Sequence, residues 1–171
     1  MTLNELADLA EILSGIAVLV TLIFLVFQIR DNTKAMRNEV LSTHYTDGFE
    51  MIADGSRIPE LAEAAYKAFT HQPLEGMDRY HLSNWVTRTG NLMERALLME
   101  QSGVLDHESF ERSVLPGKNL LSTPAGRKTY ERLLQEGLFG SEFREYMKNY
   151  YAELDRQASQ AAKRLDEDEP A

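Results

Sequence analysis

The chain has 171 residues, enough for one modest hydrophobic core, and it contains no cysteine, which excludes disulfides, thiolate metal sites and cysteine nucleophiles. Its 27 acidic residues outnumber its 18 basic residues, and the resulting net charge of −9 opposes binding to the phosphate backbone of nucleic acids. We therefore expect one small globular core and no nucleic-acid partner.

An uncharged apolar run extends from Ile12 to Ile29. Thirteen of its 18 residues are Leu, Ile, Val or Phe, and a helix of this length spans about 27 Å, close to the bilayer's hydrocarbon core of about 30 Å. A core helix is the first alternative, but it would need cover on every face, which so short a chain can hardly provide. A signal peptide is the second, but the run lacks preceding basic residues and a following A-x-A-like site. The run is predicted to be a transmembrane helix.

The charges on either side of this run differ in sign. Three acidic residues and no basic residue precede it, whereas Arg30, Lys34 and Arg37 follow it. Because positively charged flanks stay in the cytoplasm, the N-terminus is predicted to lie outside and the C-terminal domain in the cytoplasm. The three basic residues share one face of a continuing helix, where they serve as a topology signal or contact anionic lipid headgroups at the membrane surface.

Small residues form a stripe along the predicted anchor. Ala10, Ser14, Ala17 and Thr21 are spaced by four, three and four residues, and Gln28 follows on the same face. Small side chains allow two membrane helices to approach closely, so the stripe predicts a helix–helix interface with another copy or with a different membrane protein. Alternatively, the hydroxyl groups merely bond to carbonyls of their own helix.

The part after the anchor is predicted to be all-α. No segment shows the alternation typical of strands, whereas apolar residues recur at helical spacing. The anchor helix is expected to continue to about residue 53, and about five helices form a small domain over residues 31–165, after the N-terminal tail and anchor at 1–30. The acidic end, 166–171, is predicted to be disordered.

Cap and turn residues indicate where these helices begin and end. Asp106 and Thr123 are expected at helix N-caps, Ser141 is expected to cap the last helix, and Gly137 is a stop signal. The pair Pro116–Gly117 is expected to end the helix that starts after Asp106, because proline breaks the helical hydrogen-bond ladder.

Three segments, "EILSGIAVLVTLIFLVFQIRDNT", "TPAGRKTYERL" and "FGSEFREY", resemble a broad family of uncharacterised bacterial proteins. Members of this family open with an apolar helix that ends in a Q-I-R-x-N-T-like stretch and continue as a small helical domain. The resemblance implies a single-pass protein of the bacterial inner membrane, and it implies no activity, cofactor or catalytic residue.

The sequence shows no catalytic or metal-binding motif. The four histidines have no second ligand at i+3 or i+4, and phosphate-binding glycine loops and nucleophile elbows are absent. Tyr146 and Tyr150 are expected in the core, whereas Tyr151 lies off their stripe and could face a partner. We therefore expect no catalytic residue, no cofactor and no metal.

Two functions fit these observations. The first is a membrane-anchored helical protein that acts through protein–protein contacts, as an accessory subunit or a homo-oligomer, and is not an enzyme. The second is a membrane-tethered enzyme or small-molecule sensor whose site comes from residues far apart in the sequence. A pocket with converging polar groups would favour the second.

Overall fold

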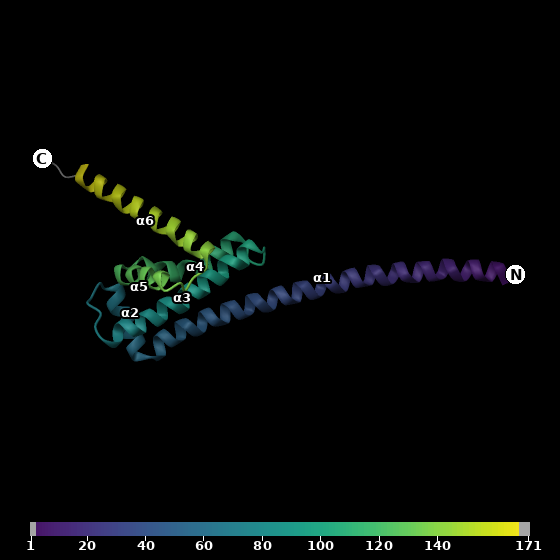
Figure 1. The fold of residues 1–171 in the computed structure, drawn as a ribbon, viewed down its shortest axis with the longest axis horizontal. Helices are drawn as coiled ribbons and strands as arrows, with labels where there is room; N and C mark the ends of the chain where they lie inside the picture. The colour runs from purple at the N-terminus through teal and green to yellow at the C-terminus, as the bar shows by residue number, and fades with distance from the viewer. Residues whose placement is uncertain (1–2, 168–171) are drawn as a thin grey trace. The chain divides into compact units, whose positions relative to one another are not determined.

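The structure, a computed structural model, describes residues 3–167 and, within that range, the side chains of residue 4 and of residues 11–164. All regular secondary structure in the described range is helical (Figure 1). The six helices are α1 (Leu3–Arg57), α2 (Pro59–Phe69), α3 (Met77–Gln101), α4 (His107–Ser122), α5 (Pro124–Gln135) and α6 (Ser141–Glu167). The predicted all-α fold, with a long apolar first helix followed by five helices, is confirmed.

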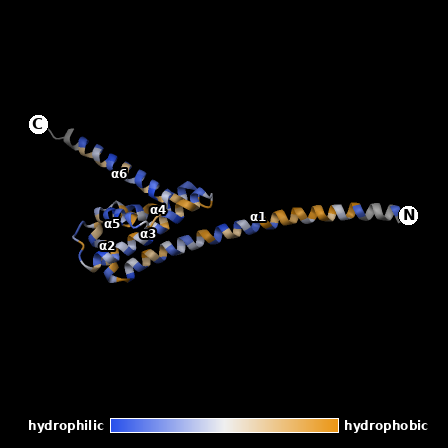
Figure 2. Cartoon of the chain, in the orientation of Figure 1, coloured by the Kyte–Doolittle hydropathy of each residue, from blue (hydrophilic) through white to orange (hydrophobic). Residues whose placement is uncertain are grey.

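The chain divides into two compact units, Met1–Thr43 and His44–Ala171. The first contains the apolar run, which lies within α1. Every residue from 11 to 40 is exposed, and the large apolar side chains of the run keep between 45% (Leu25) and 65% (Ile29) of their surface accessible. Figure 2 shows this part of α1 as a continuous hydrophobic segment. The helix is long and apolar enough to cross a membrane, and nothing in the described structure buries it.

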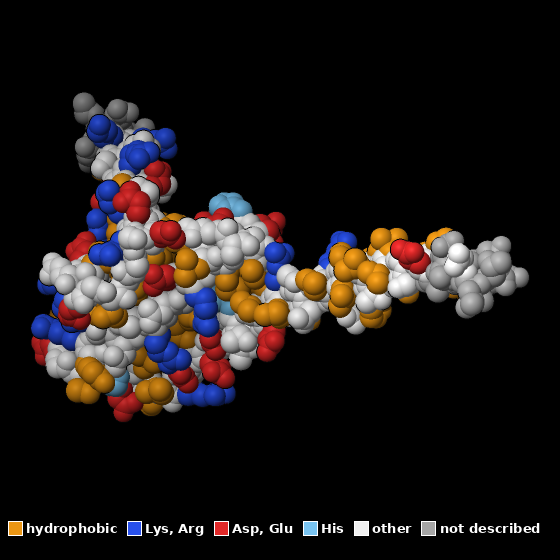
Figure 3. Space-filling view, turned by 45° about the vertical axis from the view of Figure 1, so that its right-hand side comes forward, with side chains coloured by type: hydrophobic (Ala, Val, Ile, Leu, Met, Phe, Trp, Pro, Cys, Tyr) orange, Lys and Arg blue, Asp and Glu red, His pale blue; other side chains and the backbone are white. Residues whose placement is uncertain are grey.

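The second unit is a helical domain organised around α3, which packs against α2, α4 and α5. Its largest fully buried side chains come from α3, α4, α5 and α6: Leu82, Val86, Phe110, Val114, Leu121, Tyr130, Phe143 and Met147. Acidic and basic side chains are interspersed over the visible surface of this domain (Figure 3). Ion pairs such as Arg127 with Asp155, at 2.6 Å, connect helices across that surface.

An aromatic cluster attaches the first half of α6 to α5. The Tyr130 ring lies 5.4 Å from that of Phe139, 6.2 Å from that of Phe143 and 5.8 Å from that of Tyr151. The sequence-based expectation that Tyr151 faces a partner is wrong: only 7% of this residue is exposed, and its hydroxyl donates to the Leu121 carbonyl at 3.1 Å. The buried face of α6 therefore follows Phe143, Met147 and Tyr151, spaced four residues apart.

Several helix ends are where local chemistry predicts them. The Asp106 carboxylate accepts the amide hydrogen of Ser109 at 2.8 Å, and the Thr123 hydroxyl accepts that of Gly126 at 3.0 Å. Each bond satisfies one of the amides that a helix N-terminus leaves without a partner. Gly137 has a φ of +77°, a left-handed conformation that glycine adopts at low cost after a helix.

The expected end of a helix at Pro116–Gly117 is wrong, because α4 continues through both residues to Ser122. Packing against α3 compensates for the missing proline amide. Gly117 is buried, and a β-carbon at this position would overlap the Met93 sulfur, so the glycine allows α3 and α4 to approach closely.

Three smaller differences concern other helix ends. α1 ends at Arg57, four residues later than expected. Ser141 is the first residue of α6 rather than its cap, since the carbonyl that accepts the Arg144 amide hydrogen belongs to Gly140. Two residues of the expected disordered tail, 166 and 167, are helical, and the remaining four lie outside the described residues.

Candidate functional site: an apolar pocket of the helical domain

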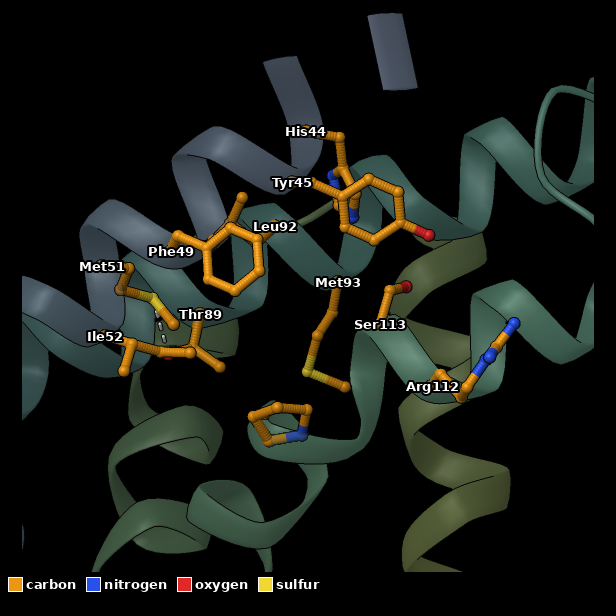
Figure 4. Close-up of a pocket in the computed structure, with 13 residues that line it drawn as sticks. His44, Tyr45, Phe49, Met51, Ile52, Thr89, Leu92, Met93, Arg112 and Ser113 are labelled. Atoms are coloured by element: carbon orange, nitrogen blue, oxygen red, sulfur yellow. Dashed lines mark hydrogen bonds between the residues drawn. The ribbon is translucent and has the colours of Figure 1, made fainter. Parts of the chain in front are cut away.

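A pocket of about 410 Å³ opens between the last turns of α1, the middle of α3 and the centre of α4 (Figure 4). This volume lies within the range of about 300–1,000 Å³ typical of small-molecule sites. Most of the lining is apolar. The lining residues are His44, Tyr45, Gly48, Phe49, Met51 and Ile52 from α1, Thr89, Leu92 and Met93 from α3, and Arg112, Ser113, Pro116 and Gly117 from α4.

The row Tyr45, Phe49 and Ile52 forms the outer rim of the pocket. These residues are spaced by four and three, so they share one face of α1, and 42%, 70% and 50% of their surfaces are exposed. Large apolar side chains this exposed are unusual when they form a continuous row, and such rows mark binding surfaces. The same helix contributes buried residues, such as Met51, to the domain core.

His44 is the buried polar group of the pocket. Only 5% of this residue is exposed, and its Nδ1 atom has no hydrogen-bond partner. Burial lowers the pKa of His44, and the positive charge of Arg95 lowers this pKa further, against the smaller opposite effect of Asp47. The lowered pKa favours the neutral imidazole at pH 7, and Nδ1 is a buried hydrogen-bonding atom without a partner.

The other polar groups of the lining already have partners or reach solvent. The Thr89 hydroxyl lies 3.5 Å from the Met51 sulfur, and the Ser113 hydroxyl donates to a carbonyl of its own helix at 2.8 Å. Arg112 is largely exposed, and its guanidinium lies 3.8 Å from the Glu108 carboxylate. The lining contains no carboxylate, and this combination of an apolar wall with one buried imidazole and one surface cation suits binding.

The site residues predicted from the sequence lie elsewhere, in the first unit. The side chains of Ser14, Ala17, Thr21 and Gln28 are exposed along α1, and that of Ala10 lies outside the described side chains. The Thr21 hydroxyl donates to the Ala17 carbonyl at 2.8 Å, as the alternative interpretation of this stripe expects.

The predicted membrane-surface residues also lie on the first unit. Arg30, Lys34 and Arg37 are exposed, and together with Phe27, Asp31 and Thr33 they border a shallow hollow along α1. None of them lines the apolar pocket. Sequence reasoning missed that pocket, although the spacing of Tyr45, Phe49 and Ile52 was a readable signal for its rim.

None of the three other histidines lines the apolar pocket. The Nδ1 atom of His107 lies 2.6 Å from the Glu100 carboxylate, which raises the pKa of His107. The His81 ring contacts that of Tyr80, and His71 lies in the connection between α2 and α3. Over the described residues, no three potential ligands from His, Asp or Glu come close enough to hold a metal ion.

Comparison of the chain with protein-family models, with curated proteins and with solved structures gives no match. The resemblance to a bacterial family with a Q-I-R-x-N-T-like stretch therefore stays a prediction. A proposal for function has to be built on the geometry of the two units.

Proposed function

We propose that this chain is a single-pass protein of the bacterial inner membrane whose helical domain acts in the cytoplasm through protein–protein contacts, with no enzymatic activity of its own. The observation that carries the proposal is that every residue of the apolar run in α1 is exposed. On insertion scales each strongly apolar residue contributes roughly −0.3 to −0.6 kcal/mol, so the thirteen of this run contribute about −5 kcal/mol.

The flanking charges support the orientation. Arg30, Lys34 and Arg37 follow the run, and no basic residue precedes it. The positive side of a membrane helix usually stays in the cytoplasm, which supports a cytoplasmic position for the larger unit. The partners would be the bilayer and either a second copy or another membrane protein. The exposed row Tyr45, Phe49 and Ile52 supports a protein contact by the helical domain.

Membrane integration and orientation are tested together in cells that express the full chain. The protein should stay in the membrane fraction after alkaline carbonate extraction, and the helical domain should resist protease added outside intact spheroplasts. Release by carbonate would refute the anchor. Cleavage of the domain from outside would refute the orientation.

The small-residue stripe is tested by crosslinking in native membranes. If the stripe packs against another helix, Ser14→Leu combined with Ala17→Leu separates the two helices and reduces the yield of a crosslinked dimer or complex. Leu19→Phe combined with Val26→Leu is the control, since these residues lie on the opposite face of the helix. Equal yields from both double variants would show that the anchor is only a tether.

The apolar pocket favours a second candidate function, a membrane-tethered small-molecule sensor. Its volume and its mostly apolar lining fit an apolar ligand, and exposed Arg112 favours a negative charge on that ligand. Gly48 lines the pocket, and nothing lies within 4 Å of a β-carbon added at this position. A larger side chain at position 48 would therefore fit without a clash and would occupy part of the pocket.

The sensor is tested with the full chain in nanodiscs and anilinonaphthalene sulfonate, an anionic aromatic probe, with empty nanodiscs as the blank. The pocket predicts saturable binding that Gly48→Leu weakens at least tenfold. Unchanged binding by this variant would refute the sensor and leave the first proposal standing.

A further inference from the structure

A second hollow of the helical domain differs in character from the apolar pocket. It has a volume of about 640 Å³ and lies between the α2–α3 connection, the first turns of α3 and one side of α5. Three of its nine lining residues are basic, namely Arg79, Lys128 and Arg132, and none is acidic. This local excess of positive charge is unexpected in a chain with a net charge of −9.

In another hollow of the helical domain, the basic residues are paired with carboxylates of the same chain. There Arg88 and Arg95 are accompanied by two acidic lining residues, Asp47 and Glu50. The Arg95 guanidinium lies 2.6 Å from the Asp47 carboxylate, and that of Arg88 lies 2.8 Å from the carboxylate of Asp54. In the basic hollow, Arg132 has such a partner in Glu136, whereas Arg79 and Lys128 form no ion pair within the described part of the chain, so an anion from outside would be their natural counterion.

Hydrogen bonds hold both guanidinium groups of the basic hollow in place. Nε of Arg79 donates to the Leu74 carbonyl at 2.8 Å, and Nη2 of Arg132 donates to the Ser83 hydroxyl at 2.7 Å. Arg132 also bonds through Nη1 to Glu136 at 2.8 Å, just outside the hollow. Because an arginine carries five N–H donors, the bond from Nε leaves both terminal nitrogens of Arg79 available to a ligand.

The remaining polar groups of the lining are the Lys128 ammonium and several neutral side chains. Lys128 is exposed one helical turn before Arg132 on α5, and the hollow also presents the Tyr80 and Thr129 hydroxyls and the Gln72 amide. The Thr129 hydroxyl already donates to its own helix. Guanidinium forks and ammonium groups together match the oxygens of phosphate, which they bind by charge-assisted hydrogen bonds.

We propose that this hollow binds a phosphate-bearing small molecule through Arg79, Lys128 and Arg132. This inference is independent of the proposed protein contacts and of the apolar pocket, since it uses none of their residues. The phosphate could be carried by a soluble ester or by a lipid headgroup, because both present the same oxygens. Long polyanions such as RNA are disfavoured by the net negative charge of the chain.

The test uses the full chain in phosphatidylcholine nanodiscs and isothermal titration with inorganic pyrophosphate at constant ionic strength. Arg79→Gln and Lys128→Gln should each weaken binding about tenfold, which corresponds to about 1.4 kcal/mol. Lys163→Gln on α6 is the matched control, because it removes one exposed positive charge far along the chain and should change the dissociation constant less than twofold.

Two results would overturn the proposal. One is the absence of saturable pyrophosphate binding by the wild-type chain. The other is an equal loss from Lys163→Gln, since that would indicate attraction by overall charge. Unchanged thermal unfolding of both hollow variants verifies that they are folded, as expected for exposed side chains.

The source of the phosphate is distinguished by repeating the titration in nanodiscs that contain phosphatidic acid. Competition by this lipid, lost in Arg79→Gln, identifies a lipid headgroup as the occupant. Unchanged pyrophosphate affinity identifies a soluble phosphate ester. Either result upholds the phosphate site, and neither depends on whether the anchor helix has a protein partner.

Discussion

Adding one methyl group at Gly90 tests the packing of the α5–α6 connection, through Phe139, against α3. A β-carbon at this position would lie 2.5 Å from Cε1 and 2.6 Å from Cζ of the Phe139 ring. Carbon atoms normally pack at about 3.5–4.0 Å, so the ring would have to move by roughly 1 Å. That ring is 2% exposed and lies 5.4 Å from both the Tyr130 and Phe143 rings, which leaves it little room.

The net effect of Gly90→Ala is the difference between two opposing contributions. Alanine favours a helix over glycine by about 1 kcal/mol, whereas overpacking a tight core costs about 1–3 kcal/mol. The rigid surroundings of Phe139 place the cost at the upper end, so we expect a net destabilisation of about 2 kcal/mol. Gly48→Ala is the matched control, because its added β-carbon has nothing within 4 Å and should stabilise the helix by up to about 1 kcal/mol.

Unfolding of the full chain in detergent, followed by the fluorescence of its single tryptophan, Trp85, measures the difference. Gly90→Ala should lower the melting temperature by roughly 5–10 °C relative to wild type, whereas Gly48→Ala should not lower it. A Gly90→Ala variant that melts at the wild-type temperature or above would refute the inference that Gly90 and Phe139 are tightly packed. A double-mutant cycle with Phe139→Leu checks the cause, since the smaller side chain should relieve part of the loss.

Three further predictions use the same unfolding assay. Tyr151→Phe removes the buried bond to the Leu121 carbonyl and should cost about 1 kcal/mol, whereas no loss would mean that solvent replaces this bond. Thr123→Ala removes the cap of α5 and should cost about 1 kcal/mol, with Thr123→Ser retaining most of the stability. Burial lowers the pKa of His44 below its ordinary value of 6.5, so the unfolded chain takes up this proton more readily. Protonation of His44 in the unfolded chain should therefore lower the free energy of unfolding as the pH falls below about 6.5. The melting temperature of His44→Gln should depend less on pH than that of the wild type, and an unchanged pH dependence would contradict this.

Helix boundaries that depend on neighbouring residues could be predicted from the sequence. The caps at Asp106 and Thr123 require only a side-chain oxygen within three residues of a free amide, and the stop at Gly137 requires only a glycine. Such interactions are local, so the residue pattern is enough to specify them.

The course of α4 and the burial of Tyr151 could not be predicted, because they depend on contacts between distant segments. Proline at position 116 disfavours a helix locally, and the close packing of Gly117 against Met93 outweighs that preference. Tyr151 lies 30 residues from Leu121, whose carbonyl accepts its hydrogen bond. Spacing along one helix could not identify this acceptor.

Neither the apolar pocket nor the basic hollow could be predicted as a site, because each is formed by residues that are far apart in the sequence. The apolar pocket joins residues of three helices, and the basic hollow joins Arg79 of α3 with Lys128 and Arg132 of α5. In the sequence, these three basic residues are scattered within an acidic chain and form no motif. Only the packing of α3 against α5 brings them together.

Of the three helices that line the apolar pocket, α4 is the one with a proline in its lining segment, and it is the easiest to bend. A helix resists bending because each amide is tied to the carbonyl four residues earlier, and Pro116 lacks this tie to Arg112. The segments of α1 and α3 that line the same pocket contain no proline. We therefore expect a larger ligand to bend α4 between Arg112 and Gly117 more readily than it bends the segments of α1 and α3.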